Sequence, residues 1–454
     1  MPIISHNPAT GEDIQKFHEL TDEEIQEKIA KAQSAFNVYK KFSIEKRSEM
    51  LKSVAAHLRE NKVAYGTLIT EEIGRPLAPS IAEIEKCALA CDYYAEQGPE
   101  MLKPEMVVTE ARESYVTLEP LGIVFAVMPW NFPFWQVLRF AAPALIAGNV
   151  GLLKPASNVP RCAEAIESIF LKCGYDEGIF QNLFVSGGRT EIIIRDPRVK
   201  AVTLTGSEWA GRKVAEIAGD EIKPSVLELG GSDAFIVLAS ADIEKAARVG
   251  AQARLQNCGQ SCIAAKRFII EESVYDKFLE LFTIEFKNFV PDDPKNPDTK
   301  IGPVATQSGL EDVEKQVVSS IEKGASVAIG GKRIEKPGYF YSPTILTGVK
   351  SGMPAYNEEI FGPVASVIKV RDEAEAITVA NDSPFGLGSS LWSNDREQIE
   401  RIIPQIEAGC VFVNSMVKSD PRLPFGGVKK SGYGRELSYF GLREFVNVKT
   451  VSIE

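Results

Sequence analysis

The stretch 121-LGIVFAVMP-129 is an uninterrupted apolar run about as long as one β-strand. Strands of this kind are buried on both faces, as in parallel sheets that helices cover. Pro133 follows shortly afterwards and suits the first turn of a helix, which we expect to run to 147-AGN-149. The stretch therefore predicts a buried strand followed by a helix, the beginning of an α/β fold.

The alternation of strand and helix patterns continues downstream of this run. A first series has expected strands at 150–155, 181–186, 200–206 and 225–230, with helices at 159–173, 189–195 and 208–219. A second has expected strands at 234–238, 267–272, 340–346, 364–370, 387–392 and 410–414, with helices at 242–256, 273–289, 373–381 and 395–407. Such alternation indicates two parallel sheets, which bind ligands at the carboxyl ends of their strands.

The two ends of the chain have different patterns. We expect the first 100 residues to be helical, with a capping box from Thr21 and Glu24 at the start of the first helix. Apolar residues then recur at helical spacing, and further helices are expected at 44–61 and 79–98. The tail 444-EFVNVKTVSIE-454 has strand character with interspersed charges, so it is expected to be an edge strand.

Composition restricts the class of protein. With 454 residues, the chain is long enough for two or three domains of the usual ~150 residues. Its net charge of -11 argues against nucleic-acid and membrane partners, and no apolar run approaches the ~20 residues of a membrane span. Seven cysteines without a CxxC pair and only three histidines argue against disulfides and a metal site. Since the first 15 residues also lack a signal-peptide pattern, we expect a cytoplasmic protein.

Cys262, in 259-GQSCIAAK-266, is the first candidate for chemistry. Backbone N–H groups in a polar turn can stabilise a thiolate there. The alternative is a buried structural thiol, because cysteine is among the most buried residue types. Cys258, four residues upstream, could share a helical face with Cys262, although an inert thiol is the favoured interpretation.

Further candidates follow the expected strands. Glu228 ends a strand as either a general base or a solvated acid, and Asn131 is either an oxyanion donor or a helix N-cap. Lys154 is either a phosphate ligand or a surface lysine. The segment 203-TLTGSEWAG-211 predicts a phosphate site at a helix N-terminus, without the GxGxxG fingerprint. The glycine-rich segment 424-PFGGVKKSGYGRE-436 could simply be a long surface connection.

In this order and spacing, the motifs PWNFP, LLKPA, TGS, LELGG, GQSC, EEIFGPV and PFGG-x3-SGYGRE resemble the aldehyde dehydrogenase superfamily nearly end to end. The SDAF and GQSCIAAKRF segments most resemble its bacterial succinate-semialdehyde dehydrogenase branch. The resemblance implies a Rossmann-like dinucleotide-binding domain (1–108 and 122–228) and a second α/β catalytic domain (229–415). It also implies an oligomerisation sheet from 109–121 and 440–454, which would make a homodimer or homotetramer.

The same resemblance implies roles for individual residues. Cys262 is the nucleophile, Asn131 and the Cys262 backbone N–H hold the oxyanion, and Glu228 activates the water that hydrolyses a thioester. The presence of Glu228 favours hydrolysis over transfer to coenzyme A or phosphate. The implied cofactor-binding residues are Pro129, Trp130, Lys154, Ala156, Ser157, Gly187, Gly206, Ser207, Glu359 and Phe361.

Ser157 predicts the choice of cofactor. Many NAD-preferring relatives have a glutamate at this position, whose charge would repel a 2′-phosphate. Serine removes that repulsion and can donate a hydrogen bond, while Lys154 supplies positive charge. Charges ~4 Å apart near a surface interact by a few kcal/mol, so we expect NADP to be preferred and NAD to be tolerated.

Arg139 predicts the substrate. It lies eight residues after Asn131, about 80° away around a helix at ~100° per residue, so both could face one tunnel. Its planar guanidinium can bind a carboxylate through two hydrogen bonds. The alternative is an arginine on the surface, exposed to solvent. The resemblance assigns Arg139 and Ser419 to the distal carboxylate of succinic semialdehyde. A second arginine of the mammalian branch is replaced by Gln256, which leaves Arg254 or Lys418 as possible substitutes.

Three alternatives stay open on the sequence. The first is the same chemistry on glutaric semialdehyde or simple aliphatic aldehydes. The second is a cysteine hydrolase or acyltransferase, which the scarcity of histidine disfavours. The third is a binding protein on a degenerate enzyme fold, which the joint presence of Cys262, Glu228 and Asn131 disfavours.

Overall fold

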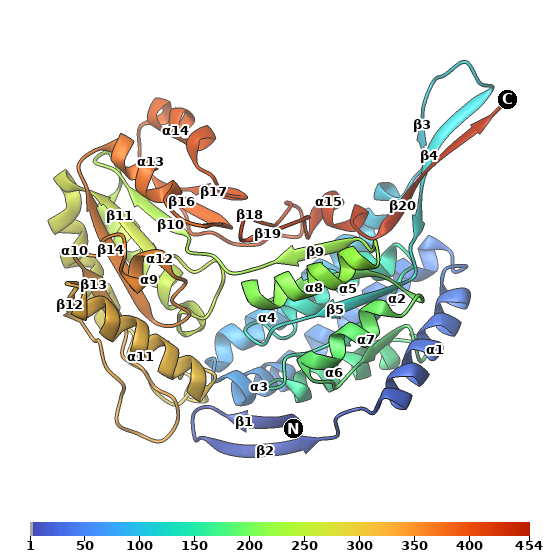
Figure 1. Ribbon diagram of the computed structural model, residues 1–454, viewed down its shortest axis with the longest axis horizontal. Helices are drawn as coiled ribbons and strands as arrows, with labels where there is room; N and C mark the ends of the chain where they lie inside the picture. Colours follow the sequence, from blue (N-terminus) through green and yellow to red (C-terminus); the bar gives the residue numbers. More distant parts are fainter. Residues whose placement is uncertain (1–2) are drawn as a thin grey trace.

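The computed structural model describes residues 3–454. Two α/β lobes lie side by side, and a narrow arm of strands projects from the first lobe (Figure 1). Each lobe has its own sheet and its own cluster of buried apolar side chains. The α/β class expected from alternating strand and helix patterns is therefore confirmed.

The first sheet contains the apolar run at 121–129. Its strands lie in the order β19-β9-β8-β5-β6-β7, and the five strands from β5 to β9 are parallel. They are β5 (Ile123–Val127), β6 (Val150–Lys154), β7 (Phe180–Asn182), β8 (Val199–Thr205) and β9 (Ser225–Glu228). The connecting helices are α5 (Trp135–Ile146), α6 (Pro160–Lys172), α7 (Thr190–Arg195) and α8 (Glu208–Asp220). The strand and helix predicted from the run are confirmed as β5 and α5.

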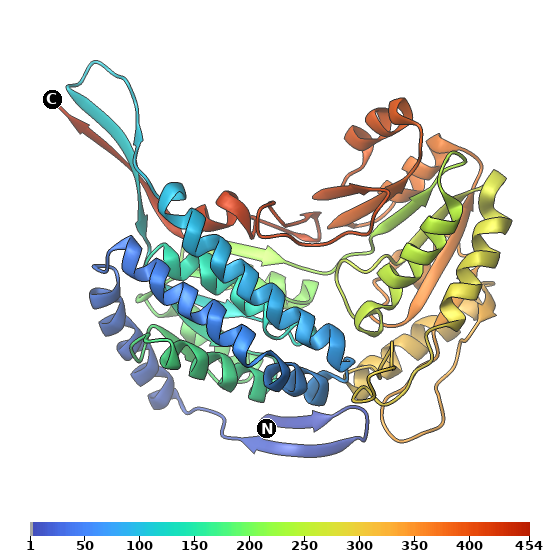
Figure 2. The same cartoon turned by 180° about the vertical axis from the view of Figure 1, so that it is seen from behind.

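The N-terminal region is only partly as expected. Four helices, α1 (Asp22–Tyr39), α2 (Ile44–Glu60), α3 (Lys62–Ile73) and α4 (Leu77–Met101), lie in front of the first sheet when it is seen from behind (Figure 2). The capping box of Thr21 and Glu24 is present. The helical expectation is wrong for the first residues, where β1 (Ile3–Asn7) and β2 (Glu12–Phe17) form an antiparallel hairpin. Gly11, with φ of 78°, closes the turn, and its amide donates to the Asn7 carbonyl.

The second sheet has the order β12-β13-β14-β11-β10-β16-β17. These strands are β10 (Ala234–Val237), β11 (Arg267–Glu271), β12 (Ser326–Ile329), β13 (Thr344–Thr347), β14 (Val364–Val370), β16 (Gly388–Trp392) and β17 (Cys410–Val413). The packed helices are α9 (Ile243–Leu255), α10 (Glu272–Lys287), α11 (Gln307–Glu322), α12 (Pro354–Asn357), α13 (Glu373–Asn381) and α14 (Arg396–Ile402). The sequence prediction had missed α11 and β12, the one antiparallel strand of this sheet.

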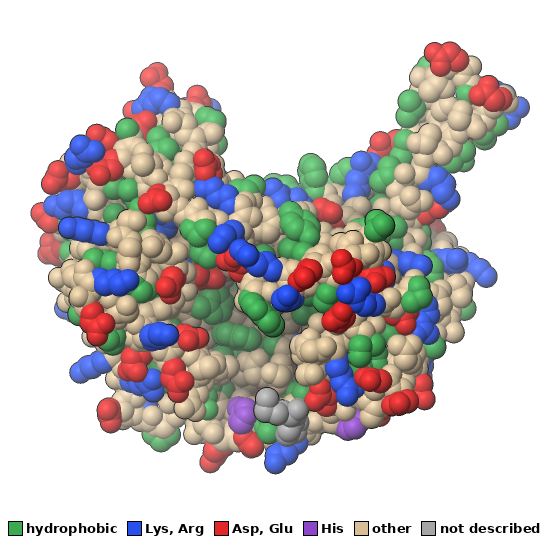
Figure 3. Space-filling model, viewed as in Figure 1, with side chains coloured by type: hydrophobic (Ala, Val, Ile, Leu, Met, Phe, Trp, Pro, Cys, Tyr) green, Lys and Arg blue, Asp and Glu red, His purple; other side chains and the backbone are tan. Residues whose placement is uncertain are grey.

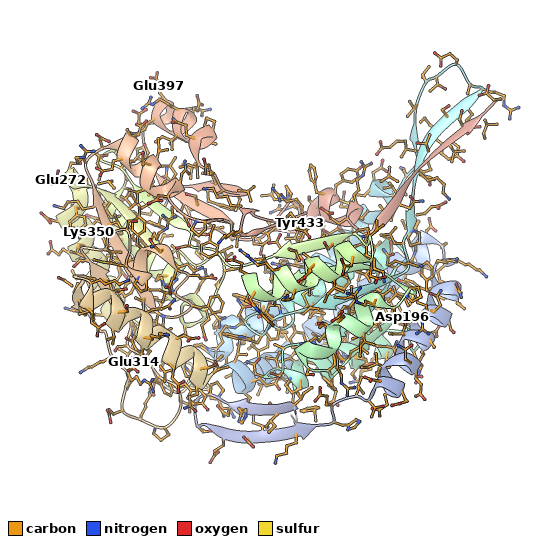
Figure 4. The ribbon with its side chains drawn as sticks, in the orientation of Figure 1. Asp196, Glu272, Glu314, Lys350, Glu397 and Tyr433 are labelled. Carbon is orange, nitrogen blue, oxygen red and sulfur yellow. The ribbon has the colours of Figure 1, made fainter. Side chains whose placement is uncertain are left out.

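The chain returns to the first lobe after β17. The strands β15 (Phe385–Gly386) and β18 (Val428–Lys429) pair with each other, and β19 (Gly432–Tyr433) pairs antiparallel with β9. The glycine-rich segment is therefore not a simple surface connection, because it adds an edge strand beside Glu228. Tyr433, labelled in Figure 4, marks this edge, and its hydroxyl lies 2.7 Å from Ser225 Oγ.

The arm is a three-stranded antiparallel sheet in the order β20-β4-β3. It consists of β3 (Glu105–Met106), β4 (Glu113–Pro120) and β20 (Val446–Ile453), and β20 follows the short helix α15 (Ser438–Arg443). The register joins Val446 to Pro120 and Ile453 to Glu113. The edge strand expected in the tail is thus confirmed as β20.

Candidate active site

A cavity of about 710 Å³ lies between the lobes. The space-filling view shows this face of the molecule hollowed at the same place (Figure 3). Its size is within the range of small-molecule and cofactor sites. Residues from both lobes line it, among them Pro129, Trp130, Asn131, Gly206, Ser207, Cys262, Glu359 and Phe361.

Parallel pairing explains why residues distant in sequence meet at this cavity. Strands β5, β6, β8 and β9 run in the same direction, so their carboxyl ends form one edge of the sheet. Val127 pairs with Lys154, and Thr205 pairs with Glu228. The segments that follow these strands carry the predicted residues of the first lobe.

The loop that carries Cys262 follows α9 through a tight turn. Asn257 and Cys258 have positive φ angles of 49° and 55°, so the loop is not helical, and the predicted shared face for Cys258 and Cys262 is wrong. Cys258 is buried instead, which raises its pKa to about 12. Gly259 is required here, because a Cβ would lie 2.1 Å from the Gly362 carbonyl oxygen.

Asn131 is joined directly to this loop. Its Nδ2 donates to the backbone carbonyl of Gln260 at 3.0 Å, while its Oδ1 accepts from Gln136 Nε2 at 3.0 Å. Within residues 3–454 no second bond is formed by Nδ2, so one N–H is left for a ligand. Since α5 begins only at Trp135, Asn131 is not the N-cap of that helix.

The thiol of Cys262 is half-buried, and burial and nearby positive charges have opposite effects on its pKa. Burial raises the pKa of Cys262 to about 12, while the positive charges of Lys266 and Arg139 act in the opposite direction. Lys266 Nζ donates to the Cys262 carbonyl at 2.6 Å and pairs with Glu359 at 3.1 Å. At neutral pH the resting thiol is therefore mostly protonated.

Glu228 is buried, and the solvated-acid alternative is wrong because the residue is only 2% exposed. Neither carboxyl oxygen has a hydrogen-bond partner among residues 3–454. Burial, together with the nearby Glu436 carboxylate, raises the pKa of Glu228 well above its usual range, against the influence of Arg139. A buried, unpaired carboxyl with a raised pKa suits general acid–base catalysis.

Arg139 lies in a network of buried side chains close enough to Cys262 to influence its pKa. It is buried, it forms an ion pair with Glu436, and it donates to Thr205 Oγ1 at 3.2 Å. Its guanidinium also stacks 5.0 Å from the ring centre of Phe425. The surface-arginine alternative is therefore wrong, and Arg139 is not among the residues that line the cavity between the lobes.

The other candidates for a carboxylate contact have different surroundings. Arg254 is fully buried and donates to backbone carbonyls, including that of Ile360 at 2.8 Å, so it is unsuited to a substrate. Lys418 is exposed. Ser419 is buried and accepts a hydrogen bond of 2.6 Å from Lys86 Nζ. Lys86 was not identified from the sequence, because no motif surrounds it in the middle of α4.

The predicted cofactor residues divide into two groups. Glu359 accepts from the Gly231 amide at 3.1 Å, and the Phe361 ring lies edge-on to Trp130 with centres 5.7 Å apart. These residues line the cavity, as does the start of α8, where Ser207 is the N-cap. The second group lies outside the cavity lining, along the chain that follows β6 and β7, and consists of Lys154, Ala156, Ser157 and Gly187.

Comparison with known proteins explains this arrangement. The profile described as "Aldehyde dehydrogenase family" matches residues 2–451. The chain belongs to the aldehyde dehydrogenase family. The resemblance found in the motifs is thus confirmed, and so is the aldehyde dehydrogenase fold.

Close relatives of this aldehyde dehydrogenase carry a common name. The "Succinate-semialdehyde dehydrogenase [NADP(+)] 1" of Mycobacterium tuberculosis (strain H37Rv) is 49% identical over 456 residues, covering all of both chains. A "Probable succinate-semialdehyde dehydrogenase [NADP(+)]" of Synechocystis is 49% identical over 453 residues, again covering both chains. The crystal structure of succinic semialdehyde dehydrogenase from Streptococcus pyogenes with NADP+ has a TM-score of 0.97 at 39% identity, covering 99% of each chain.

The described part of this aldehyde dehydrogenase, residues 3–454, has no helix with the length and apolar character needed to traverse a bilayer.

Proposed function

We propose that this aldehyde dehydrogenase oxidises succinic semialdehyde to succinate with NADP as the preferred cofactor, NAD being tolerated. The observation that carries the proposal is the hydrogen bond that joins Asn131 to the loop of Cys262, since Asn131 and Cys262 both line the cavity. Full-length identity of 49% to proteins named for this activity supports the choice of substrate.

The cavity and its edge fit a dinucleotide with a 2′-phosphate. Ser207 and Gly206, at the start of α8, offer the amide groups of a 13-residue helix to the diphosphate. Among residues 3–454, Lys154 Nζ donates only to the Pro155 carbonyl at 3.2 Å, and burial alone accounts for its lowered pKa, so no carboxylate of this part of the chain opposes a phosphate there. Lys154 and the exposed Ser157 would hold the 2′-phosphate, and Glu359 and Phe361 the nicotinamide ribose.

The chemistry begins with Cys262. The thiol first gives up its proton to solvent; the resulting thiolate attacks the carbonyl carbon and forms a C–S bond, while the carbonyl electron pair moves to oxygen. The oxyanion accepts hydrogen bonds from Asn131 Nδ2 and from the Cys262 backbone N–H. The bound nicotinamide supplies the hydride acceptor, and this oxidation of the adduct leaves a thioester on Cys262.

Hydrolysis of the thioester depends on Glu228. In its deprotonated form it removes a proton from water, whose oxygen attacks the thioester carbon. The C–S bond then breaks, the carboxylic acid leaves and the Cys262 thiolate is restored. Since burial and Glu436 raise the pKa of Glu228, a captured proton is readily held until the acid has left.

The proposed substrate and cofactor preferences are tested with a panel of aldehydes, each assayed with NADP and with NAD. The absorbance of the reduced nicotinamide measures the rate. The proposal expects kcat/KM to be highest for succinic semialdehyde, above glutaric semialdehyde and butanal, and higher with NADP than with NAD. A preference for butanal would instead support the alternative of simple aliphatic aldehydes.

We also propose a homodimer or homotetramer assembled through the arm. Strand β20 is an edge strand of eight residues, and edges of this kind are usually covered by another chain or blocked.

The cytoplasm is the proposed location, since all seven cysteines are unpaired, as in a reducing compartment. The domain limits, 1–108 with 122–228 and 229–415, stay predictions.

A further inference from the structure

Lys86 is a half-buried cation whose contacts have no catalytic assignment so far. It lies on α4, and its Nζ donates to Ser419 Oγ at 2.6 Å. The same ammonium lies 4.0 Å from the ring centre of Trp135, the first residue of α5. Helix α4 and the segment after β17 thus meet at this one group.

No carboxylate neutralises Lys86 in the described chain, where residues 3–454 form no ion pair with it. Glu83, one turn earlier on α4, is paired with Arg75 and accepts from the amides of Phe134 and Trp135 at 2.8 Å. Asp420 is bound by Arg422, which holds the pKa of Asp420 at about 2. Both nearby acids are therefore committed to arginines.

The ammonium is also close to a second cation. Burial, together with the positive charge of Arg139, lowers the pKa of Lys86 to about 8. Arg139 is itself compensated by Glu436, so the uncompensated charge belongs to Lys86. The titratable groups that act on it are Arg139 from α5, Cys87 and Glu83 from α4, and Asp420. An isolated, partly desolvated cation is unfavourable until an anion binds it.

The position of Lys86 relates it to the nucleophile. The two bonds from Glu83 fix α4 against the start of α5, just after the corner that carries Asn131. Arg139, on the same helix, acts electrostatically on both Cys262 and Lys86. Lys86 also contacts Trp135, whose neighbour Gln136 lines the cavity and donates to Asn131 Oδ1.

We propose that Lys86, together with the Ser419 hydroxyl, binds the distal carboxylate of the substrate. Arg139 remains paired with Glu436. In this arrangement Ser419 accepts from the ammonium and donates its own proton to the carboxylate, while Lys86 donates directly. The inference rests on the proposed function, because it requires a substrate with a carboxylate.

The experiment compares Lys86→Gln and Lys86→Arg with the parent enzyme on succinic semialdehyde and on butanal, which lacks the carboxylate. Loss of a charged hydrogen bond predicts that Lys86→Gln lowers kcat/KM for the semialdehyde by about 10-fold to 150-fold, mainly through KM. Butanal turnover should stay within about 2-fold, and Lys86→Arg should recover part of the loss. Unchanged butanal turnover also shows that the variant is folded.

The matched control is Lys46→Gln, which removes an exposed ammonium 3.7 Å above Phe42 and should leave both aldehydes unaffected. If the parent enzyme prefers the semialdehyde and Lys86→Gln keeps this preference, the proposed role of Lys86 is overturned while the proposed function stands. A parent that oxidises butanal as well as the semialdehyde would instead contradict the proposed function, and the inference with it.

Discussion

The side-chain amide of Asn131 lies 3.0 Å from the backbone carbonyl oxygen of Gln260. This hydrogen bond crosses between the lobes and ties the corner after β5 to the loop of Cys262. A second contact supports it, because Asn257 Nδ2 donates to the Asn131 carbonyl at 2.8 Å. The proposed oxyanion donor and the loop of the proposed nucleophile are therefore held together before any substrate arrives.

Replacing Asn131 by alanine tests the role of this amide. We expect kcat to fall by about 100-fold to 1000-fold, the usual effect of removing one oxyanion donor. Binding of NADP, measured by fluorescence titration, should change little. Gln136→Ala, which removes only the support of Asn131 Oδ1, should have a smaller effect. A kcat within a few-fold of the parent for Asn131→Ala would contradict the assignment.

Glu228→Gln should separate the two halves of the reaction. The variant keeps the shape of the side chain but cannot accept a proton from water, so thioester hydrolysis should slow by about 100-fold or more. Rapid mixing should still show a first turnover of reduced nicotinamide, followed by a very slow steady state. Mass spectrometry should detect the acyl group on Cys262. Parent-like steady-state turnover would exclude Glu228 as the base.

The pKa of Cys262 predicts how the free enzyme reacts with iodoacetamide. Burial raises this pKa to about 12, so only a small fraction of the thiol is ionised at neutral pH. Because the thiolate is the reactive form, alkylation should accelerate about 10-fold per pH unit from pH 7 upward. The Cys262 peptide can be followed by mass spectrometry. A rate that levels off below pH 8 would contradict this environment.

A titration effect is also expected at Lys86, whose pKa is lowered to about 8. Below that pH the ammonium is charged, and above it the charge is lost. The kcat/KM for succinic semialdehyde should therefore fall relative to that for butanal as the pH rises through 8. A ratio of the two values that stays constant from pH 6 to pH 10 would argue against an ammonium partner.

Ser157→Glu should reverse the preference for NADP. A carboxylate beside Lys154 would repel a 2′-phosphate, and such an interaction is worth a few kcal/mol near a surface. The kcat/KM for NADP should fall by about 100-fold, while that for NAD should hold or improve. Ser157→Ala removes only a hydrogen bond and should cost less than about 10-fold. An unaltered cofactor ratio in Ser157→Glu would show that the phosphate binds elsewhere.

Much of the fold could be predicted because buried parallel strands have a local signature. Runs such as 121–129 are apolar throughout, and helices separate them at regular intervals. The hairpin Ile3–Phe17 was missed because its second strand is almost fully exposed and strongly polar. Nothing in such a segment distinguishes a strand that only covers a surface from the start of a helix.

The candidate site was predictable where its residues follow strand ends or lie in motifs. Asn131, Glu228 and Cys262 were identified for that reason. The pairing of Arg139 with Glu436 and the contact of Lys86 with Ser419 join residues hundreds of positions apart. Such contacts depend on how α4, α5 and the returning chain pack, and no local pattern encodes them. The sequence therefore indicated a carboxylate partner but not which cation stays uncompensated.

The most direct test of the account is the turnover of Cys262→Ser, measured with succinic semialdehyde and NADP beside Cys258→Ser. The account predicts that Cys262→Ser loses at least about 1000-fold in kcat, since a hydroxyl is a far weaker nucleophile than a thiolate. Cys258→Ser, which changes a buried thiol of the same loop, should stay within a few-fold of the parent. If Cys262→Ser retained parent-like turnover, covalent catalysis at that sulfur would be contradicted.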